Sequence, residues 1–343
     1  MVSVLVTGGA GYIGTHVMTV LGKRGYRCLS IDNHVNSSRE AIERASALVP
    51  GRIAHHEMDI RDTDSLSRLL ASHPIDAVIH LAGLKAVGES VACPDRYYDN
   101  NVRGTQCLLD ALKGSPVRRF VFSSSATVYG LAETMPITES APTAPQNPYG
   151  ENKLAIEQML ARQARDDPSW RVVSLRYFNP VGAHESGTIG EDPSGVPNNL
   201  MPYLCQVATG RRECLRIFGS DYPTPDGTGV RDYIHVMDLA EGHVAALDAL
   251  DGSLPGAVMT VNLGTGRGNS VLELVNAFER ANGVTIRKVL TDRRPGDIAV
   301  CYADPSRARR VLGWEAQRTL DDMCRDAWRW QSLNPDGYGK ARA

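Results

Sequence analysis

Tyr149 and Lys153 lie four residues apart in a segment whose residue types suit proton transfer. Residues i and i+4 share one face of a helix, and Pro148, directly before Tyr149, favours a helix start there. A phenol ordinarily titrates near pH ~10, so it needs a neighbouring positive charge to act as a base near neutral pH. Lys153 supplies that charge. An isolated pair of this kind is usually part of a helix surface, so its interpretation depends on the surrounding elements.

A glycine-rich turn near the amino terminus predicts a phosphate-binding site. Residues 2–6 read as a buried strand, Gly8, Gly11 and Gly14 follow it, and an apolar periodic stretch comes next. This order lets the backbone approach a pyrophosphate closely and directs the N–H groups of a helix start towards it. The following strand ends in Asp32, whose carboxylate suits the ribose hydroxyls of NAD and would repel the 2′-phosphate of NADP.

A serine cluster follows another predicted strand. Ser123, Ser124 and Ser125 come after residues 119–122, at the carboxyl edge of the expected sheet, where open α/β folds bind ligands. The Ser125 hydroxyl can hydrogen-bond the ligand oxygen from which Tyr149 takes a proton. The sequence therefore predicts a Ser–Tyr–Lys arrangement. Serines at such positions also form turns and cap helices. The glycine turn and the Tyr/Lys pair together favour the catalytic interpretation.

Alternating strand and helix patterns predict the scaffold that positions these groups. We expect strands at about residues 2–6, 27–31, 52–57, 76–80, 118–123 and 171–177, and helices at about 12–24, 38–47, 64–71, 96–112 and 149–165. Residues 181–231 are rich in Gly, Pro and Asp and predict loops that line a cleft. Residues 258–263 predict a strand that returns to the main sheet, and a helix at about 319–331 closes the fold.

These elements predict an α/β fold with a doubly wound parallel Rossmann sheet and a smaller, discontinuous α/β substrate-binding lobe. The first domain comprises residues 1–180, with returning segments at about 232–264, and binds the NAD. Residues 181–231 and 265–343 form the second lobe.

Composition narrows the class of protein. The 343 residues are 42% hydrophobic and 22% charged with a formal net charge of −2, which fits a globular enzyme and gives no sign of a nucleic-acid partner. A membrane partner is not expected, because no apolar stretch of about 18 residues occurs. The seven cysteines are scattered without C-x-x-C pairs, which favours a reduced cytoplasm and no metal site.

Several longer motifs make the chain resemble the UDP-glucose 4-epimerase (UDP-galactose 4-epimerase) family. Members of this family are extended short-chain dehydrogenases/reductases. Besides the three features above, it shows the segments at residues 80–87, 97–102, 176–180, 198–202, 229–236 and 293–297. The resemblance runs nearly end to end. It implies an isomerase of galactose metabolism with bound NAD, a UDP-hexose substrate and a homodimer built on the helices at about 96–112 and 149–165.

The resemblance also implies the reaction and the residues that serve it. Tyr149 takes the proton from the sugar 4-hydroxyl while NAD takes the hydride from carbon 4, which leaves a 4-keto sugar. After this sugar turns over, the hydride and the proton return to it, and carbon 4 is inverted. Lys153 holds down the pKa of Tyr149, and Ser125 orients the oxygen. The implied cofactor contacts are Gly8, Gly11, Tyr12, Ile13, Gly14, Asp32, Asn33, Asn36, Ser37, Asp59, Ile60, Leu81, Ala82, Gly83, Lys85, Asn100, Tyr149, Lys153 and Tyr177. Asp59 has a second interpretation, as the cap of the following helix.

The implied sugar-nucleotide contacts lie mostly in the second half of the chain. They are Lys85, Ser125, Tyr149, Phe178, Asn179, Asn198, Asn199, Leu200, Arg216, Phe218, Arg231, Tyr233, Arg294, Asp297 and Cys301. Arg231 and Arg294 form the expected pyrophosphate clamp, because guanidinium groups match phosphate oxygens. Arg216 stands where the family often has a small residue. Cys301 stands where members restricted to UDP-glucose and UDP-galactose tend to have Tyr, so we expect room for the acetamido group of UDP-GlcNAc and UDP-GalNAc unless other side chains close the pocket.

Two other functions remain to be weighed. A nucleotide-sugar 4,6-dehydratase or decarboxylase is one, but relatives with that activity carry an Asp-Glu pair directly after the hydroxyl residue. Here Ser125 is followed by Ala126 and Thr127. A non-catalytic NAD-sensing regulator is the other, and such a protein need not keep Ser125, Tyr149 and Lys153, all of which are present.

Overall fold

A seven-stranded parallel sheet forms the centre of the computed structural model, which describes residues 2–294 and 296–339. Its order is β11-β6-β5-β4-β1-β2-β3. The strands are β1 (Ser3–Thr7), β2 (Arg27–Asp32), β3 (Ile53–Glu57), β4 (Ala77–His80), β5 (Arg119–Ser123), β6 (Arg171–Tyr177) and β11 (Val258–Leu263). The predicted doubly wound sheet and the returning strand are confirmed. The predicted domains and motifs also include Met1, Pro295 and residues 340–343, which lie outside the described residues.

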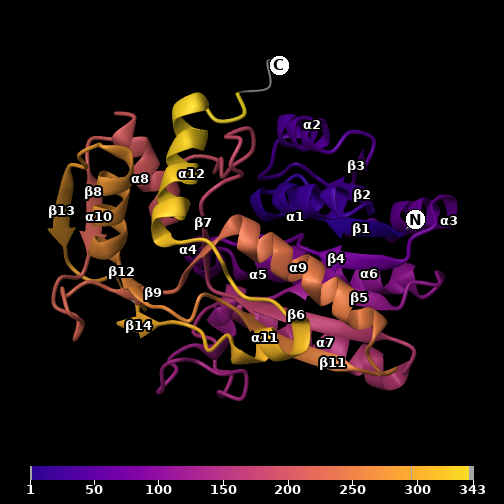
Figure 1. The fold of residues 1–343 in the computed structure, drawn as a ribbon. Coiled ribbons are helices and arrows are strands. Elements are labelled where there is room, and N and C mark those ends of the chain that lie inside the picture. The colour runs from indigo at the N-terminus through magenta and orange to yellow at the C-terminus, as the bar shows by residue number, and fades with distance from the viewer. Residues whose placement is uncertain (1, 295, 340–343) are drawn as a thin grey trace.

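Helices cover both faces of this sheet (Figure 1). One face packs against α1 (Tyr12–Lys23), α9 (Val236–Asp251) and α11 (Ser306–Leu312), with α2 (Arg39–Leu48) beside α1. The other face packs against α3 (Thr63–Ser72), α6 (Gly104–Leu112) and α7 (Pro148–Asp166). Val4, Leu5 and Val6 of β1 are fully buried, as continuous apolar runs are in a sheet covered on both sides.

A smaller α/β lobe surrounds a second apolar core, at the left of Figure 1. It contains α8 (Leu200–Ala208), β8 (Leu215–Phe218), α10 (Val271–Asn282), β13 (Lys288–Thr291) and α12 (Leu320–Leu333). The prediction of loops throughout residues 181–231 was therefore wrong for α8 and β8. Met201, Leu204 and Cys205 give α8 a buried face, but the high Gly and Pro content around it concealed this short element in the sequence.

Short strands join the two parts of the molecule. β7 (Asn179–Val181) pairs with β10 (Tyr233–His235). β9 (Val230–Arg231) lies between β12 (Asn269–Ser270) and β14 (Val300–Cys301). These pairings bring residues 179, 231 and 301, which are far apart in the sequence, to the region where the second lobe meets the sheet.

The helix predicted at about residues 96–112 is longer and interrupted. It consists of α4 (Val87–Ala92), α5 (Pro94–Tyr98), a π-helical turn at Asp99–Arg103 and α6. Pro94 starts α5 because proline suits the first turn of a helix but not its interior. π-Helical turns are rare and are frequent at functional sites, and this one contains the predicted cofactor residue Asn100.

Candidate active site

The Tyr149/Lys153 pair lies at the start of α7, and its side chains are buried. The Asn147 side chain accepts a hydrogen bond from the Gly150 N–H at 2.9 Å, and Pro148 occupies the first helical turn. Tyr149 is 6% exposed and Lys153 is 4% exposed, so neither is a surface residue of an amphipathic helix. The helix therefore presents a phenol and an ammonium group to the interior on one face.

The pKa of Tyr149 differs from the expectation. Burial raises it, the nearby phenol of Tyr177 adds to the rise, and hydrogen bonding to Ser125 acts in the opposite direction. The ammonium of Lys153 lies 5.7 Å from the centre of the Tyr149 ring and donates instead to the Ser123 carbonyl at 2.7 Å. Lys153 therefore does not hold down the pKa of Tyr149 in this arrangement, and the phenol is neutral.

Lys153 is itself tuned by its surroundings. Burial lowers its pKa to about 8, and the carboxylate of Glu157 opposes this effect. The ammonium also lies 4.9 Å from the centre of the Phe122 ring, a distance at which a cation and an aromatic face attract each other. The side chain is thus charged at neutral pH and can lose a proton slightly above it.

Ser125 takes the second role considered for it, that of a cap. It lies just after β5 and caps the 3₁₀ turn Ala126–Tyr129, where its Oγ accepts hydrogen bonds from the Thr127 N–H at 3.2 Å and the Thr127 hydroxyl at 3.0 Å. Hydrogen bonding to Ser125 also lowers the pKa of the Tyr149 phenol, against the larger effect of burial. The structure thus brings Ser125, Tyr149 and Lys153 to the carboxyl edge of the sheet.

A buried ion pair behind these residues escaped the sequence analysis. Glu157 accepts two hydrogen bonds from Arg176, at 2.9 Å and 2.6 Å, and one from the Ser124 hydroxyl at 2.6 Å. Both charged side chains are less than a tenth exposed. The pair therefore joins α7, β6 and the segment after β5. The sequence offered one indication of this pair, because Glu157 lies one helical turn after Lys153.

We expect Glu157→Gln to lower the free energy of unfolding by about 3 kcal/mol, because Arg176 would remain buried without a full counter-charge. Denaturant unfolding measures the change. The matched control is Asp321→Asn, which removes the partner of Arg280 in an exposed ion pair at 2.7 Å and should cost less than about 1 kcal/mol. Equal effects of the two variants would contradict this role for the buried pair.

The glycine turn between β1 and α1 leaves the backbone open to a phosphate. Gly8 has a φ of +69°, and a Cβ there would lie 2.7 Å from the Ala82 nitrogen. A Cβ on Gly14 would lie 2.3 Å from the Gly8 carbonyl oxygen. Both positions therefore require glycine. Gly11 forms the N-cap of α1, and Tyr12 and Ile13 begin the helix, so its free N–H groups face outward from the turn.

Predicted adenosine contacts gather after β2 and β3. Asp32 accepts hydrogen bonds from the N–H groups of Ala10 and His34, and the Ser37 hydroxyl donates to it at 2.8 Å. Asn33 and Asp59 line a hollow of about 340 Å³. Asn36 lies in the same loop, and Ile60 follows Asp59 and is buried. This arrangement fits an adenosine group.

Asp59 does not cap the following helix. Asp62 does so, accepting from the Ser65 N–H at 3.0 Å. Hydrogen bonds from Arg61 hold the pKa of Asp59 well below its usual value, against the opposing effect of burial, and Asn33 also donates to it at 2.9 Å. The carboxylate is therefore ionised and faces the hollow.

The loop after β4 is fixed by an amide that the sequence analysis did not single out. Asn101 is almost fully buried and exchanges hydrogen bonds with the backbone of Leu84, at 2.8 Å and 3.0 Å. Asn100 is only partly buried and donates to Asn101 at 2.8 Å. This holds the predicted contacts Leu81, Ala82, Gly83 and Lys85 beside the glycine turn. Tyr177 ends β6 on the same edge of the sheet.

Three buried histidines make stability depend on pH. Burial lowers the pKa from 6.5 to about 3 for His16 and His80 and to about 4 for His243. They stay neutral in the folded protein while the unfolded chain binds protons below pH 6.5, so stability falls as the pH falls. Between about pH 7 and about pH 5 each should remove about 2 kcal/mol from the free energy of unfolding.

Urea unfolding across this range measures the slope. We expect His80→Gln to flatten the slope and His73→Gln, at a partly exposed position, to leave it unchanged. An unfolding midpoint independent of pH would show that the three histidines take up protons in the folded state.

The predicted sugar-nucleotide residues form two groups. Arg294 lies over the Phe218 ring at 4.7 Å and donates to Asp297 at 3.0 Å, with Arg216 exposed on the same face of β8 as Phe218. Cys301 on β14 pairs in register with Arg231 on β9, near the buried side chain of Phe178. Arg294 thus lies in the loop between β13 and β14, and Arg231 lies on β9.

The remaining predicted residues lie nearby on β7, β10 and the start of α8. Tyr233 is buried, whereas Asn179, Asn198 and Asn199 are exposed and Leu200 is partly buried. Asn199 is the N-cap of α8, yet its side chain makes no cap hydrogen bond and donates to Glu191 at 3.0 Å. Asn179 and Asn198 thus expose their amides at this edge, whereas the amide of Asn199 is held by Glu191.

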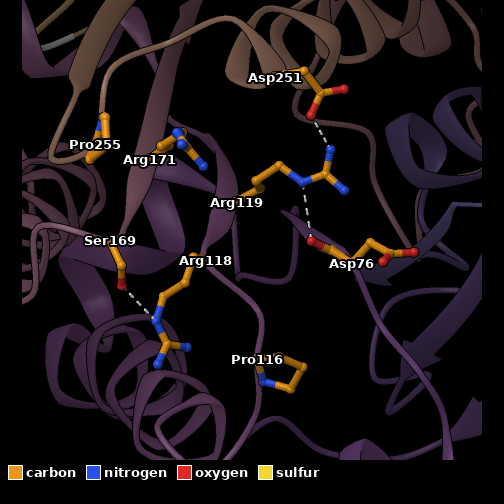
Figure 2. Close-up of a pocket in the computed structure, with 8 residues that line it drawn as sticks. All are labelled: Asp76, Pro116, Arg118, Arg119, Ser169, Arg171, Asp251 and Pro255. Carbon is orange, nitrogen blue, oxygen red and sulfur yellow. Dashed lines mark hydrogen bonds and ion pairs between the residues drawn. The ribbon is translucent and has the colours of Figure 1, made fainter.

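A hollow of about 590 Å³ at the opposite, amino-terminal edge of the sheet is not part of this site (Figure 2). Its arginines are already engaged. Arg118 donates to Ser169 at 2.9 Å, Arg119 pairs with Asp251 and donates to the Asp76 carbonyl, and Arg171 donates to the Ser253 carbonyl. These contacts tie together the segments that enter β4, β5 and β6.

The described part of the chain holds neither a cluster of metal ligands nor a membrane-spanning helix. Within residues 2–294 and 296–339, no three His, Cys, Asp or Glu side chains lie together as metal ligands would. No helix in the same residues is both long enough and apolar enough to cross a membrane.

Comparison with known proteins shows the family. A family model described as GDP-mannose 4,6 dehydratase matches residues 5–327. UDP-glucose 4-epimerase from Bacillus subtilis (strain 168) is 55% identical over 339 residues, which cover 99% of each chain. The chain belongs to the UDP-glucose 4-epimerase family.

Solved structures of this family are similar to the chain over almost its whole length. UDP-glucose-4-epimerase from Stenotrophomonas maltophila, with bound NAD and formylated UDP-arabinopyranose, is 48% identical with a TM-score of 0.95 over 98% of this chain and 99% of that one. The Bifidobacterium longum enzyme in complex with NAD+ and UDP is 52% identical with a TM-score of 0.94 over the same shares. The epimerase family thus shares the fold as well as the sequence.

Proposed function

We propose that this protein is an NAD-dependent UDP-glucose 4-epimerase, an isomerase that interconverts UDP-glucose and UDP-galactose. The observation that carries the proposal is the buried Ser125, Tyr149 and Lys153 group beside a glycine turn, at the edge of the sheet where such folds bind ligands. Family membership supports it, because relatives at 51% to 55% identity over nearly the whole chain are UDP-glucose 4-epimerases.

The catalytic residues divide the work of proton transfer. Tyr149 accepts the proton of the sugar 4-hydroxyl at its phenolic oxygen and returns it after the sugar has turned over. Ser125 hydrogen-bonds the reacting oxygen. Lys153, charged at neutral pH, favours the ionised phenol once its hold on the Ser123 carbonyl is relaxed. The neutral phenol of this structure therefore needs additional positive charge before it becomes a base.

The proposed NAD site uses the glycine turn, Asp32, the loop after β4 and Tyr177. When bound there, the nicotinamide supplies a positively charged hydride acceptor for carbon 4. The Asp32 carboxylate, held by Ala10, His34 and Ser37, selects the ribose hydroxyls and excludes a 2′-phosphate. Tyr149 packs in a buried apolar cluster with Leu84 and Tyr97, which excludes water from its phenol.

The proposed sugar-nucleotide site lies between the sheet and the second lobe. Arg231 and Arg294 neutralise the pyrophosphate, with Asn179 and Asn199 as amide donors. The Phe218 ring packs against the uracil once Arg294, which covers it here, moves to the phosphates. We also propose turnover of UDP-GlcNAc and UDP-GalNAc, because Cys301 is small and lies in register with Arg231.

The division of the chain follows from these roles. Residues 1–180 and about 232–264 bind the cofactor, and residues 181–231 and 265–343 bind the sugar nucleotide. We place the protein in the cytoplasm and infer a homodimer through the helices predicted at about residues 96–112 and 149–165, which are α5 to α7, with α4 packed beside them. Exposed apolar side chains on this surface, Val91 at 62% and Tyr98 at 52%, support the dimer. Sedimentation at the mass of one chain would contradict it.

The test is incubation of the purified protein with UDP-galactose and, separately, with UDP-GalNAc, without added NAD. The expected products are UDP-glucose and UDP-GlcNAc, which chromatography separates from the substrates. Release of a 6-deoxy-4-keto sugar would instead indicate a dehydratase. Tightly bound NAD without any turnover would indicate a regulator.

A further inference from the structure

The carboxylate of Glu191 connects two of the proposed ligand-binding side chains. Its Oε1 accepts hydrogen bonds from Lys85 Nζ at 3.0 Å and from Asn199 Nδ2 at 3.0 Å. The side chain of Glu191 is 9% exposed. One oxygen thus joins a residue of the cofactor loop to a residue of the sugar-nucleotide lobe.

The two partners come from different parts of the fold. Lys85 lies on the loop after β4, and its ammonium is 6.0 Å from the centre of the Tyr12 ring in the glycine turn. Asn199 precedes α8, and its side chain is free for Glu191 because it does not cap that helix. The pairing therefore bridges the two binding regions directly.

The main chain around Glu191 is anchored, which restricts where its carboxylate can lie. The Glu191 carbonyl accepts from the Trp330 indole N–H at 3.2 Å, and the Gly190 N–H donates to the Tyr338 hydroxyl at 3.0 Å. Both contacts come from α12 and the segment that follows it. The Glu191 carboxylate can therefore orient the side chains of Lys85 and Asn199, which donate hydrogen bonds to it.

A purely stabilising ion pair does not explain this arrangement. Half-exposed ion pairs contribute little to folding, and the Lys85 side chain is 53% exposed. Burial lowers the pKa of Lys85, but the charge and hydrogen bond of Glu191, together with the Tyr177 phenol, outweigh this and raise it, so the ammonium stays charged. The contact therefore keeps the Lys85 ammonium charged and oriented, and contributes little to the stability of the fold.

We propose that Glu191 is a positioning residue, which holds Lys85 and Asn199 in the orientation that the sugar nucleotide requires. The inference rests on the proposed function, because it takes Lys85 and Asn199 as ligand contacts. Immobilising a flexible side chain costs affinity, so binding is tighter when the free protein has already ordered both groups. Glu191 itself need not touch the ligand.

We expect Glu191→Ala to raise the KM for UDP-galactose about tenfold and to leave kcat within about twofold, because only binding geometry is lost. The Kd of UDP for the holoenzyme, measured by calorimetry, should weaken by a similar factor and does not depend on turnover. Glu185→Ala is the matched control on the same loop. Its side chain is exposed, so KM and Kd should not change.

Two further variants separate positioning from folding. Glu191→Gln keeps an acceptor of the same shape without the charge, and should weaken UDP about threefold. In a Lys85→Met background, Glu191→Ala should have a clearly smaller effect, because the two residues act through one contact.

The outcomes are decisive in either direction. Unchanged Kd and KM in both Glu191 variants, with only a lower thermal midpoint, would overturn the proposal. So would an undiminished effect of Glu191→Ala in the Lys85→Met background. Failure of the unaltered holoenzyme to bind UDP would instead contradict the proposed function.

Discussion

Tyr149→Phe is expected to lower kcat for UDP-galactose by about 10³-fold, because the substitution removes the oxygen that carries the proton. The phenylalanine ring keeps the packing against Leu84 and Tyr97, so bound NAD and the affinity for UDP should not change. Single-turnover kinetics on the holoenzyme measures the loss. The two effects together distinguish a missing proton carrier from a disrupted site.

Tyr129→Phe provides the matched control. Tyr129 is equally buried, lies a few residues after Ser125, and donates from its hydroxyl to Asn262 at 2.6 Å. Losing that hydrogen bond should cost stability but change kcat less than about threefold. A Tyr149→Phe enzyme that retains more than about a tenth of its kcat would contradict Tyr149 as the proton carrier.

Cys301→Tyr is expected to abolish turnover of UDP-GalNAc, at least about 100-fold in kcat/KM, and to leave UDP-galactose within about fivefold. Cys301 lies on β14 opposite Arg231 and is only partly buried, so a larger side chain would extend into the site. Burial raises the pKa of the thiol to about 11, so it acts as a small neutral group and not as a nucleophile. Competition between the two substrates measures the ratio.

Cys301→Ser is the control for this substitution, because it keeps the size of the side chain. It should turn over both substrates at nearly the rates of the unaltered enzyme. Equal losses on UDP-galactose and UDP-GalNAc in Cys301→Tyr would refute a selective gate. Unchanged turnover of both would show that the acetamido group lies elsewhere.

Local patterns sufficed to predict most of the fold. The apolar runs at β1, β4 and β5 and the glycine turn determine a parallel sheet, because strands that alternate with helices allow few other topologies. Three elements were predicted incorrectly for local reasons. The helix predicted at about residues 96–112 is interrupted by a π-helical turn at Asp99–Arg103, which the residue types alone do not indicate, and α8 and β8 lie in a segment dominated by residues typical of loops.

The candidate site was predictable as a set of residues but not as a network. Ser125, Tyr149 and Lys153 carry recognisable spacing, and the structure places them together. The partner of Lys153, the Ser123 carbonyl, depends on how α7 packs against β5, which sequence spacing does not reveal. Glu157 and Glu191 were missed for the same reason, because their partners lie on other elements.

The most direct test is to incubate the purified protein with UDP-galactose in D₂O, without added cofactor, and to record the proton spectrum of the product. If carbon 4 gives up and regains the same hydride while Tyr149 carries the hydroxyl proton, UDP-glucose forms with hydrogen, not deuterium, on carbon 4. Deuterium on carbon 4, or recovery of unchanged UDP-galactose, would contradict the account.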